Sequence, residues 1–141
     1  MRVGDLMTPM PITVPPETGV LAARELMAKE KIRHLLVTEG ETLVGIVTDR
    51  DIRLNLPSQA TSLSVWELNH LLQRLTVGEV MTRAVITVDP ERDAREAAQI
   101  ILDHKIGALP VLEGRRIVGI LTETDFVLGF VQMATPRAAR F

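Results

Sequence analysis

The chain has 141 residues, of which 46% are hydrophobic and 24% charged, so it can bury a core and is not expected to be disordered. Its 16 basic and 18 acidic residues give a net charge of −2 without a dominant basic cluster, so nucleic acid is not an expected partner. Cysteine is absent, which excludes disulfides and thiolate metal sites and fits a reducing cytoplasm, the expected location. No apolar signal core or run of transmembrane length is present, so no membrane association is expected.

An internal repeat organises the sequence. A shift of 74 positions aligns 3–52 with 77–126 without a gap, and about 21 of the 50 aligned pairs are identical. The landmarks are Val-Gly, Met-Thr, Ile-Thr-Val, Pro-Glu and a closing Gly-h-h-Thr-x-x-Asp box, in which h is apolar. We therefore predict one motif at 1–56, a connecting helix or linker at 57–76, a second motif at 77–133 and a C-terminal tail at 134–141.

Each repeat is predicted to fold as a β-α-β-β-α unit, which places the chain in the α+β class. In chain order, the first repeat has a short strand at 12–14, a helix at about 18–30, a strand at 35–38, a turn at 39–41, a strand at 43–47 and a helix from Thr48.

The linker has no counterpart elsewhere in the chain. A break is expected at 57–59, after which Ser62 or Ser64 can cap a helix over about 65–75. One face of that helix is apolar, with Val65, Leu68, Leu72 and Leu75.

The second repeat is predicted to repeat the same order. It has a short strand at 86–88, a helix at about 92–104, strands at 108–112 and 117–121 and a last helix from Thr122 to about 132, followed by a frayed tail at 135–141. One such unit is too small to bury its own sheet, so the two are expected to pack sheet to sheet with pseudo-twofold symmetry.

The closing box places a Thr at a helix N-cap and an Asp three residues later, as Thr48 with Asp51 and as Thr122 with Asp125. This is the spacing of a capping box, which gathers a hydroxyl, backbone N–H groups and a carboxylate at one helix start. Such residues often serve only as caps. Two copies at matched positions of a duplicated chain favour a binding site.

The repeat resembles a CBS (cystathionine β-synthase) motif, and the tandem pair resembles a CBS pair, or Bateman module. The resemblance rests on Val-Gly-Asp-Leu-Met-Thr and Val-Gly-Glu-Val-Met-Thr at the starts, Ile-Arg-His-Leu-Leu-Val and Ile-Gly-Ala-Leu-Pro-Val in the middles, and the two boxes. The stretches 64–69 and 124–131 further resemble CBS proteins assigned to acetoin utilisation.

The resemblance implies a non-catalytic regulatory module that binds AMP, ADP, ATP or S-adenosylmethionine in clefts between the two motifs, with no obligatory cofactor. In the family the box Asp accepts hydrogen bonds from both ribose hydroxyls, and the box Thr faces phosphate. The short strands and the segments before the middle strands hold the adenine and line the clefts. The binding residues implied in this chain are Thr13, Val14, Arg33, His34, Leu35, Thr48, Arg50, Asp51, Thr87, Val88, Gly107, Ala108, Leu109, Pro110, Thr122 and Asp125.

Unequal clefts are expected because the repeats differ in their cations. The resemblance implies that Arg33 and His34 reach the phosphate of a ligand whose ribose lies on Asp125. Arg50, beside the first box, is expected to contact phosphate at the Asp51 cleft, whereas Arg53 fits either a phosphate contact or an exposed charge equally well.

Catalysis and transition-metal binding are not expected. The three histidines fall in different elements without ligand spacing, and no P-loop, GxGxxG motif or nucleophile–base pair is present. Mg²⁺ sensing is an alternative function, although no dense carboxylate cluster supports it.

A homodimer is expected because helices of both repeats keep apolar stripes, chiefly Phe126, Val127, Phe130 and Val131 in the last helix. A purely structural dimerisation adaptor with empty clefts is therefore the second alternative function. A regulated partner protein is also expected, of unknown identity.

Overall fold

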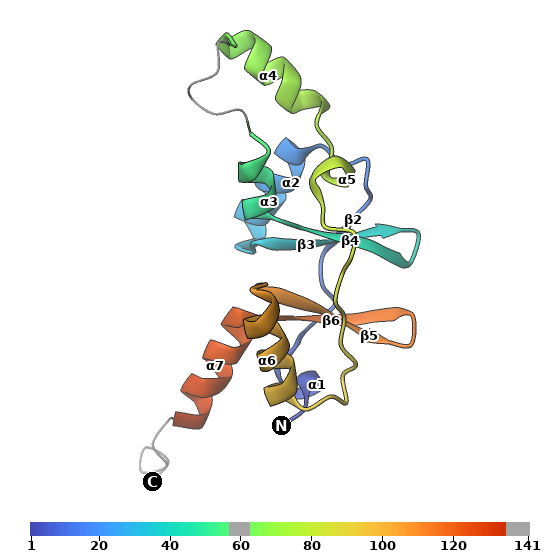
Figure 1. Ribbon diagram of the computed structural model, residues 1–141, viewed down its shortest axis with the longest axis vertical. Coiled ribbons are helices and arrows are strands. Elements are labelled where there is room, and N and C mark those ends of the chain that lie inside the picture. The colour runs from blue at the N-terminus through green and yellow to red at the C-terminus, as the bar shows by residue number, and fades with distance from the viewer. Residues whose placement is uncertain (57–62, 135–141) are drawn as a thin grey trace. The chain divides into compact units, whose positions relative to one another are not determined.

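The computed structural model describes residues 1–56 and 63–134, and Figure 1 shows the path of the chain. The chain forms two compact units, which we call the central unit (Ile12–Val85) and the terminal unit (Met1–Pro11 with Ile86–Phe141). Each unit therefore combines the body of one repeat with the leading segment of the other. The predicted break at 57–59, Ser62 as a cap and the tail at 135–141 lie outside the described residues.

The central unit is built on a three-stranded sheet of order β2-β3-β4, in which β2 runs parallel to β3 and β3 antiparallel to β4. Its elements in chain order are β2 (Thr13–Val14), α2 (Val20–Glu30), β3 (His34–Glu39), β4 (Thr42–Thr48), α3 (Asp49–Leu54), α4 (Val65–Arg74) and α5 (Val77–Val80).

The terminal unit has a three-stranded sheet of order β1-β6-β5, with both strand pairs antiparallel. Its elements are α1 (Val3–Leu6), β1 (Thr8–Pro9), α6 (Ala94–His104), β5 (Ala108–Glu113), β6 (Arg116–Thr122) and α7 (Glu123–Ala134). The strand predicted at 86–88 is reduced to a single parallel bridge between Val88 and Val111.

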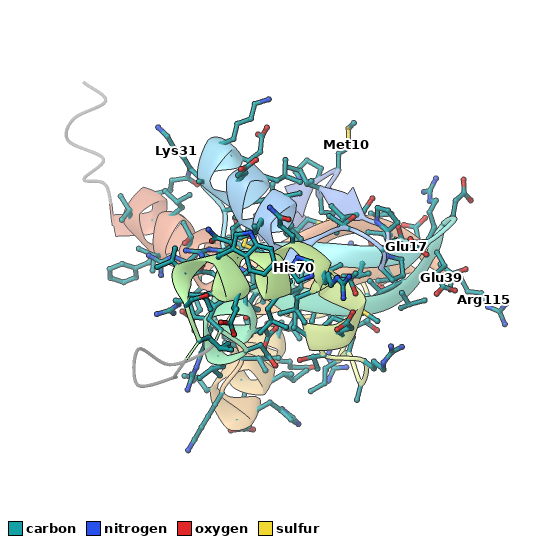
Figure 2. All side chains as sticks on the ribbon, turned by 90° about the horizontal axis from the view of Figure 1, so that it is seen from above. Met10, Glu17, Lys31, Glu39, His70 and Arg115 are labelled. Atoms are coloured by element: carbon teal, nitrogen blue, oxygen red, sulfur yellow. The ribbon has the colours of Figure 1, made fainter. Side chains whose placement is uncertain are left out.

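The two hairpins turn at matched glycines. Gly40 and Gly114 have φ values of +61° and +64°, which a residue without a Cβ adopts without strain. The hairpins also share a register shift, between Val37 and Thr38 in one and between Val111 and Leu112 in the other. Lys31, the left-handed cap that ends α2, and Glu39 at the end of β3 point into solvent (Figure 2).

The exchanged leading segments dock through backbone hydrogen bonds. In the central unit the amides of Val77 and Gly78 donate to the carbonyls of Thr18 and Pro16, at 2.8 and 3.0 Å. In the terminal unit Val3 and Gly4 repeat these bonds to Arg92 and Pro90, both at 2.8 Å. In each case the donor segment belongs to one repeat and the acceptor to the other. Neither repeat therefore builds its unit alone.

The box glycines explain why this docking is close. A Cβ on Gly45 would lie 2.4 Å from Met81 Sδ and 3.0 Å from the Thr82 carbonyl oxygen. A Cβ on Gly119 would lie 2.6 Å from Met7 Sδ and 2.9 Å from the Thr8 carbonyl oxygen. The glycine of each box is therefore required by the exchanged segment that crosses its strand.

Each unit has its own hydrophobic core between sheet and helices. The buried core of the central unit consists of Val14, Val20, Ala23, Met27, Leu35, Val37, Val47, Ile52, Val77 and Val80. The buried core of the terminal unit consists of Val3, Val88, Ala97, Ile101, Leu109, Val111 and Leu121.

The α+β class and the two repeated units are confirmed. The predicted long helices and hairpin strands are present, with ends that differ by one or two residues. Helix α4 is capped by Ser64, whose hydroxyl accepts the Glu67 amide at 3.1 Å. Helix α4 contains no buried residue, and Val65 on its predicted apolar face is exposed, so that face is covered less than the pattern implies.

The helices and strand of the exchanged segments (α1, α5 and β1) were not anticipated, because each is only two to four residues long. Within the described residues, no helix is long and apolar enough to cross a membrane.

Candidate functional site

The first box forms the predicted capping box where β4 runs into α3. The Asp51 amide donates to Thr48 Oγ1 at 2.9 Å, and the Thr48 amide donates to Asp51 Oδ2 at 3.0 Å. Both backbone donors at the helix start are thereby paired, and the carboxylate is fixed by one of its oxygens. Within residues 1–56 and 63–134, no hydrogen bond reaches the other oxygen, Asp51 Oδ1.

The second box has the same local geometry with an additional donor. The Thr122 amide donates to Asp125 Oδ2 at 2.9 Å, and the Thr122 hydroxyl lies 3.2 Å from the same oxygen. The hydroxyl of Thr8, on β1, donates to Asp125 Oδ1 at 2.9 Å. Asp125 is 8% exposed, whereas Asp51 is half-buried. The two carboxylates are therefore not equivalent.

The segment before each middle strand is joined to its box through the backbone. The Asp49 amide donates to the Arg33 carbonyl at 3.0 Å, and the Glu123 amide donates to the Gly107 carbonyl at 3.1 Å. The next residue of each segment pairs in register with the box threonine, His34 with Thr48 and Ala108 with Thr122. The residues of these two segments were predicted to line the clefts, and within each unit the structure joins them to the box.

The short predicted strands alternate between solvent and core. Thr13 and Thr87 are exposed, whereas Val14 and Val88 are buried. The side chains of Leu35 and Leu109 are fully buried in their cores, and the side chain of Pro110 is buried too. These three side chains are core residues, so any ligand contact by this part of the sheet must come from its backbone.

The arginines of the first box have different surroundings. Arg53 Nε lies 3.1 Å from Asp49 Oδ2, with side chains 62% and 40% exposed. An exposed pair of this kind is worth about 0–1 kcal/mol. The surface-charge interpretation of Arg53 is therefore the better supported one. Arg50 and Arg33 are exposed and form no ion pair with the described part of the chain, which leaves their guanidinium groups available to an anion.

The predicted site residues divide between the two units. Those with numbers up to 51 belong to the central unit, and those from Thr87 onward belong to the terminal unit. The crossed pairing of Arg33 and His34 with Asp125 joins residues of different units and stays a prediction.

Thr8, which contacts the box aspartate Asp125, was not among the residues predicted from the sequence. The Met-Thr landmark of both repeats was the available signal, since it marks Thr8 and Thr82 equally. Only the structure shows that a residue 117 positions away in sequence donates to Asp125. No group of three or more His, Asp or Glu side chains able to hold a metal ion occurs among the residues that the structure describes.

A family model of the CBS domain matches residues 3–58 and 77–131. The crystal structure of a candidate acetoin utilization protein (AcuB) from Vibrio cholerae is similar, with a TM-score of 0.79 and 31% identity over 94% of this chain and 92% of that one. Both findings agree with the resemblance drawn from the sequence.

Two further similar structures are complexes with adenosine-containing ligands. The protein CBSX2 in complex with AMP has a TM-score of 0.75 and 32% identity, covering 94% of this chain and 97% of that one. The CBS pair of protein MJ0100, in complex with 5′-methylthioadenosine and S-adenosyl-L-methionine, has a TM-score of 0.77 and 29% identity, covering 94% and 98%. The chain spans only 24% of two curated relatives that it matches, both enzymes by name.

Proposed function

The chain belongs to the family of CBS-domain proteins, and on this premise we propose that it is a non-catalytic sensor of adenosine-containing ligands such as AMP, ADP, ATP or S-adenosylmethionine. The observation that carries the proposal is the Asp51 carboxylate, held at the start of α3 through Oδ2 with Oδ1 unused by the described residues. An ionised carboxylate is only an acceptor, and a ribose offers two neighbouring hydroxyl donors.

The remaining groups of the site suit the other parts of such a ligand. The short segments 12–14 and 86–88 would hold the adenine ring, as the family resemblance implies, and Thr13 and Thr87 within them are exposed. Arg50 offers a phosphate a charge-assisted hydrogen bond at the Asp51 site, and Arg33 is the second available cation. Similar proteins bind AMP in one case and S-adenosyl-L-methionine in another, which supports the ligand class but not one member of it.

The relatives that are enzymes match this chain over a minor part of their length, so their activities do not transfer to it. A second function, a structural dimerisation adaptor, is favoured by the exposed apolar side chains of α7. Val127, Phe130 and Met133 are 61%, 71% and 73% exposed. We propose that α7 contributes to a homodimer in either case.

Thermal unfolding with separate additions of AMP, ATP, S-adenosylmethionine and MgCl₂ tests the proposal. A ligand that binds only the folded state, at a hundredfold excess over its Kd, stabilises the protein by about 2.7 kcal/mol. We expect stabilisation by at least one adenosine compound and none by the same concentration of inorganic phosphate or ribose-free adenine. Stabilisation by MgCl₂ alone would favour the magnesium sensor, and no stabilisation by any compound would favour the adaptor.

A further inference from the structure

The two box carboxylates differ in how many acceptor positions the protein itself uses. From the residues that the structure describes, Asp51 receives one hydrogen bond, from the Thr48 amide to Oδ2. Within the same described ranges Asp125 receives three, two from Thr122 to Oδ2 and one from the Thr8 hydroxyl to Oδ1 at 2.9 Å. A carboxylate has about four lone-pair positions, so Asp51 keeps most of them for a ligand and Asp125 keeps about one.

The two threonines cross their sheets at matched positions. Thr82, the repeat counterpart of Thr8, crosses β4 as Thr8 crosses β6, because Thr82 pairs with Ile46 and Thr8 with Ile120. Thr82 is fixed by two backbone hydrogen bonds to Ile46, at 2.9 and 3.0 Å. In the part of the chain that the structure describes, its hydroxyl makes no hydrogen bond to Asp51.

One sequence difference accompanies the difference in bonding. Thr8 is followed by Pro9, whereas Thr82 is followed by Arg83. Proline restricts the preceding residue to extended conformations, and Pro9 continues the pairing of β1 with β6 opposite Gly119. Pro9 therefore favours the extended conformation in which the Thr8 side chain reaches Asp125.

We propose that the Thr8 hydroxyl occupies the ribose-binding position of Asp125 and lowers the affinity of that site for ligands with a 2′,3′-diol. The inference rests on the proposed function and adds a specificity-determining residue to it. A diol has two hydroxyl donors and needs two acceptor positions, so at Asp125 it must displace the Thr8 hydroxyl or donate only a single hydrogen bond. At Asp51 no such displacement is needed, so the Asp51 site is the tighter one for the ribose.

The burial of Asp125 strengthens the competition. Asp125 is 8% exposed as a residue, so few water molecules can reach it when its donor is lost. A buried acceptor without a hydrogen bond destabilises the state in which it occurs. In the ligand-free protein the Thr8 hydroxyl pairs with Asp125 Oδ1 and so stabilises that state relative to the ligand-bound one. Deleting the hydroxyl therefore transfers the unpaired acceptor to the ligand-free state, which favours binding.

Calorimetric titration with adenosine and with 2′-deoxyadenosine tests the proposal. The variant Thr8→Val on an Asp51→Ala background isolates the Asp125 site, and we expect it to bind adenosine about tenfold more tightly than Asp51→Ala alone, the equivalent of one hydrogen bond to a charged group. The gain for 2′-deoxyadenosine should be smaller, because that ligand has one donor fewer. Thr8→Ser, which keeps the hydroxyl, should leave both affinities near those of the background.

The matched control is Thr82→Val on an Asp125→Ala background, which should leave adenosine binding at the Asp51 site unchanged. Thr8→Ala serves as a second hydroxyl deletion if Thr8→Val lowers the melting temperature. Equal or weaker adenosine binding in both folded Thr8 variants would overturn the inference and leave the proposed function standing. Absence of adenosine binding to the wild-type protein would overturn the proposed function and this inference together.

Discussion

At the scale of single residues, the box aspartates serve the fold and the proposed site with the same side chain. Each fixes a helix start through the amide of its box threonine, at 3.0 Å for Asp51 and 2.9 Å for Asp125. The spacing in the sequence was enough to predict this local contact. It could not predict the Thr8 contact, because a hydrogen bond across 117 positions depends on the exchange of segments between repeats.

We expect Asp51→Ala and Asp125→Ala each to remove one ligand site while the protein stays folded. Loss of a carboxylate from the first turn of a helix lowers the free energy of unfolding by about 0.3–1 kcal/mol through the helix dipole. Asp125→Ala should cost more of the unfolding free energy than Asp51→Ala, because it also abolishes the bond to the Thr8 hydroxyl. Urea unfolding measures the difference, and calorimetric stoichiometry measures the sites. Two intact sites in either variant would contradict the assignment of that aspartate to the ribose.

At the scale of elements, the exchanged segments cross β4 and β6 so closely that the first position of each box has to be a glycine. The hairpins, long helices and box helices follow from local periodicity and turn residues, so the sequence predicted them. Helix α1, strand β1 and helix α5 are two to four residues long and are held by bonds to a distant segment, such as Val77 N to Thr18 O at 2.8 Å. Local sequence carries too little information for elements of this kind.

Gly45→Ala is expected to destabilise the protein by about 1–3 kcal/mol, the usual cost of overpacking a core position. The new Cβ would lie 2.4 Å from Met81 Sδ, which can move, and 3.0 Å from the Thr82 carbonyl oxygen, which is held by a backbone hydrogen bond. Denaturant unfolding of Gly45→Ala, Met81→Ala and the double variant measures both contributions. The double variant should lose less stability than the sum of the single ones, and strict additivity would show that the methionine is not the obstacle.

At the scale of the whole molecule, the exposed apolar residues of α7 remain the strongest indication of an oligomer. The predicted stripe needs one correction, since Phe126 is half-buried and packs against the core of the terminal unit. Its other members, Val127, Phe130 and Val131, are more than half exposed. The apolar pattern of the helix could not separate the two roles, because core and surface apolar residues look alike in a sequence.

Sedimentation equilibrium at micromolar concentration should show a dimer without added ligand. Phe130→Asp should shift the equilibrium toward the monomer, because it places a charge on the proposed interface. Val65→Asp on α4, which replaces a similarly exposed apolar residue, is the matched control and should leave the dimer intact. A wild-type monomer, or equal dissociation in both variants, would exclude α7 as the interface.

The exchange of leading segments also sets an order of events during translation. Met1–Pro11 is synthesised well before its unit can form, because that unit is completed only by the chain that begins at Ile86. At about 5–20 residues per second, the ribosome takes roughly 4–15 s to synthesise the intervening stretch. Throughout that interval Val3, which ends fully buried, has no core to enter. Met1–Pro11 therefore waits for the body of its unit to be synthesised, whereas the leading segment of the second repeat meets a body that has already been made.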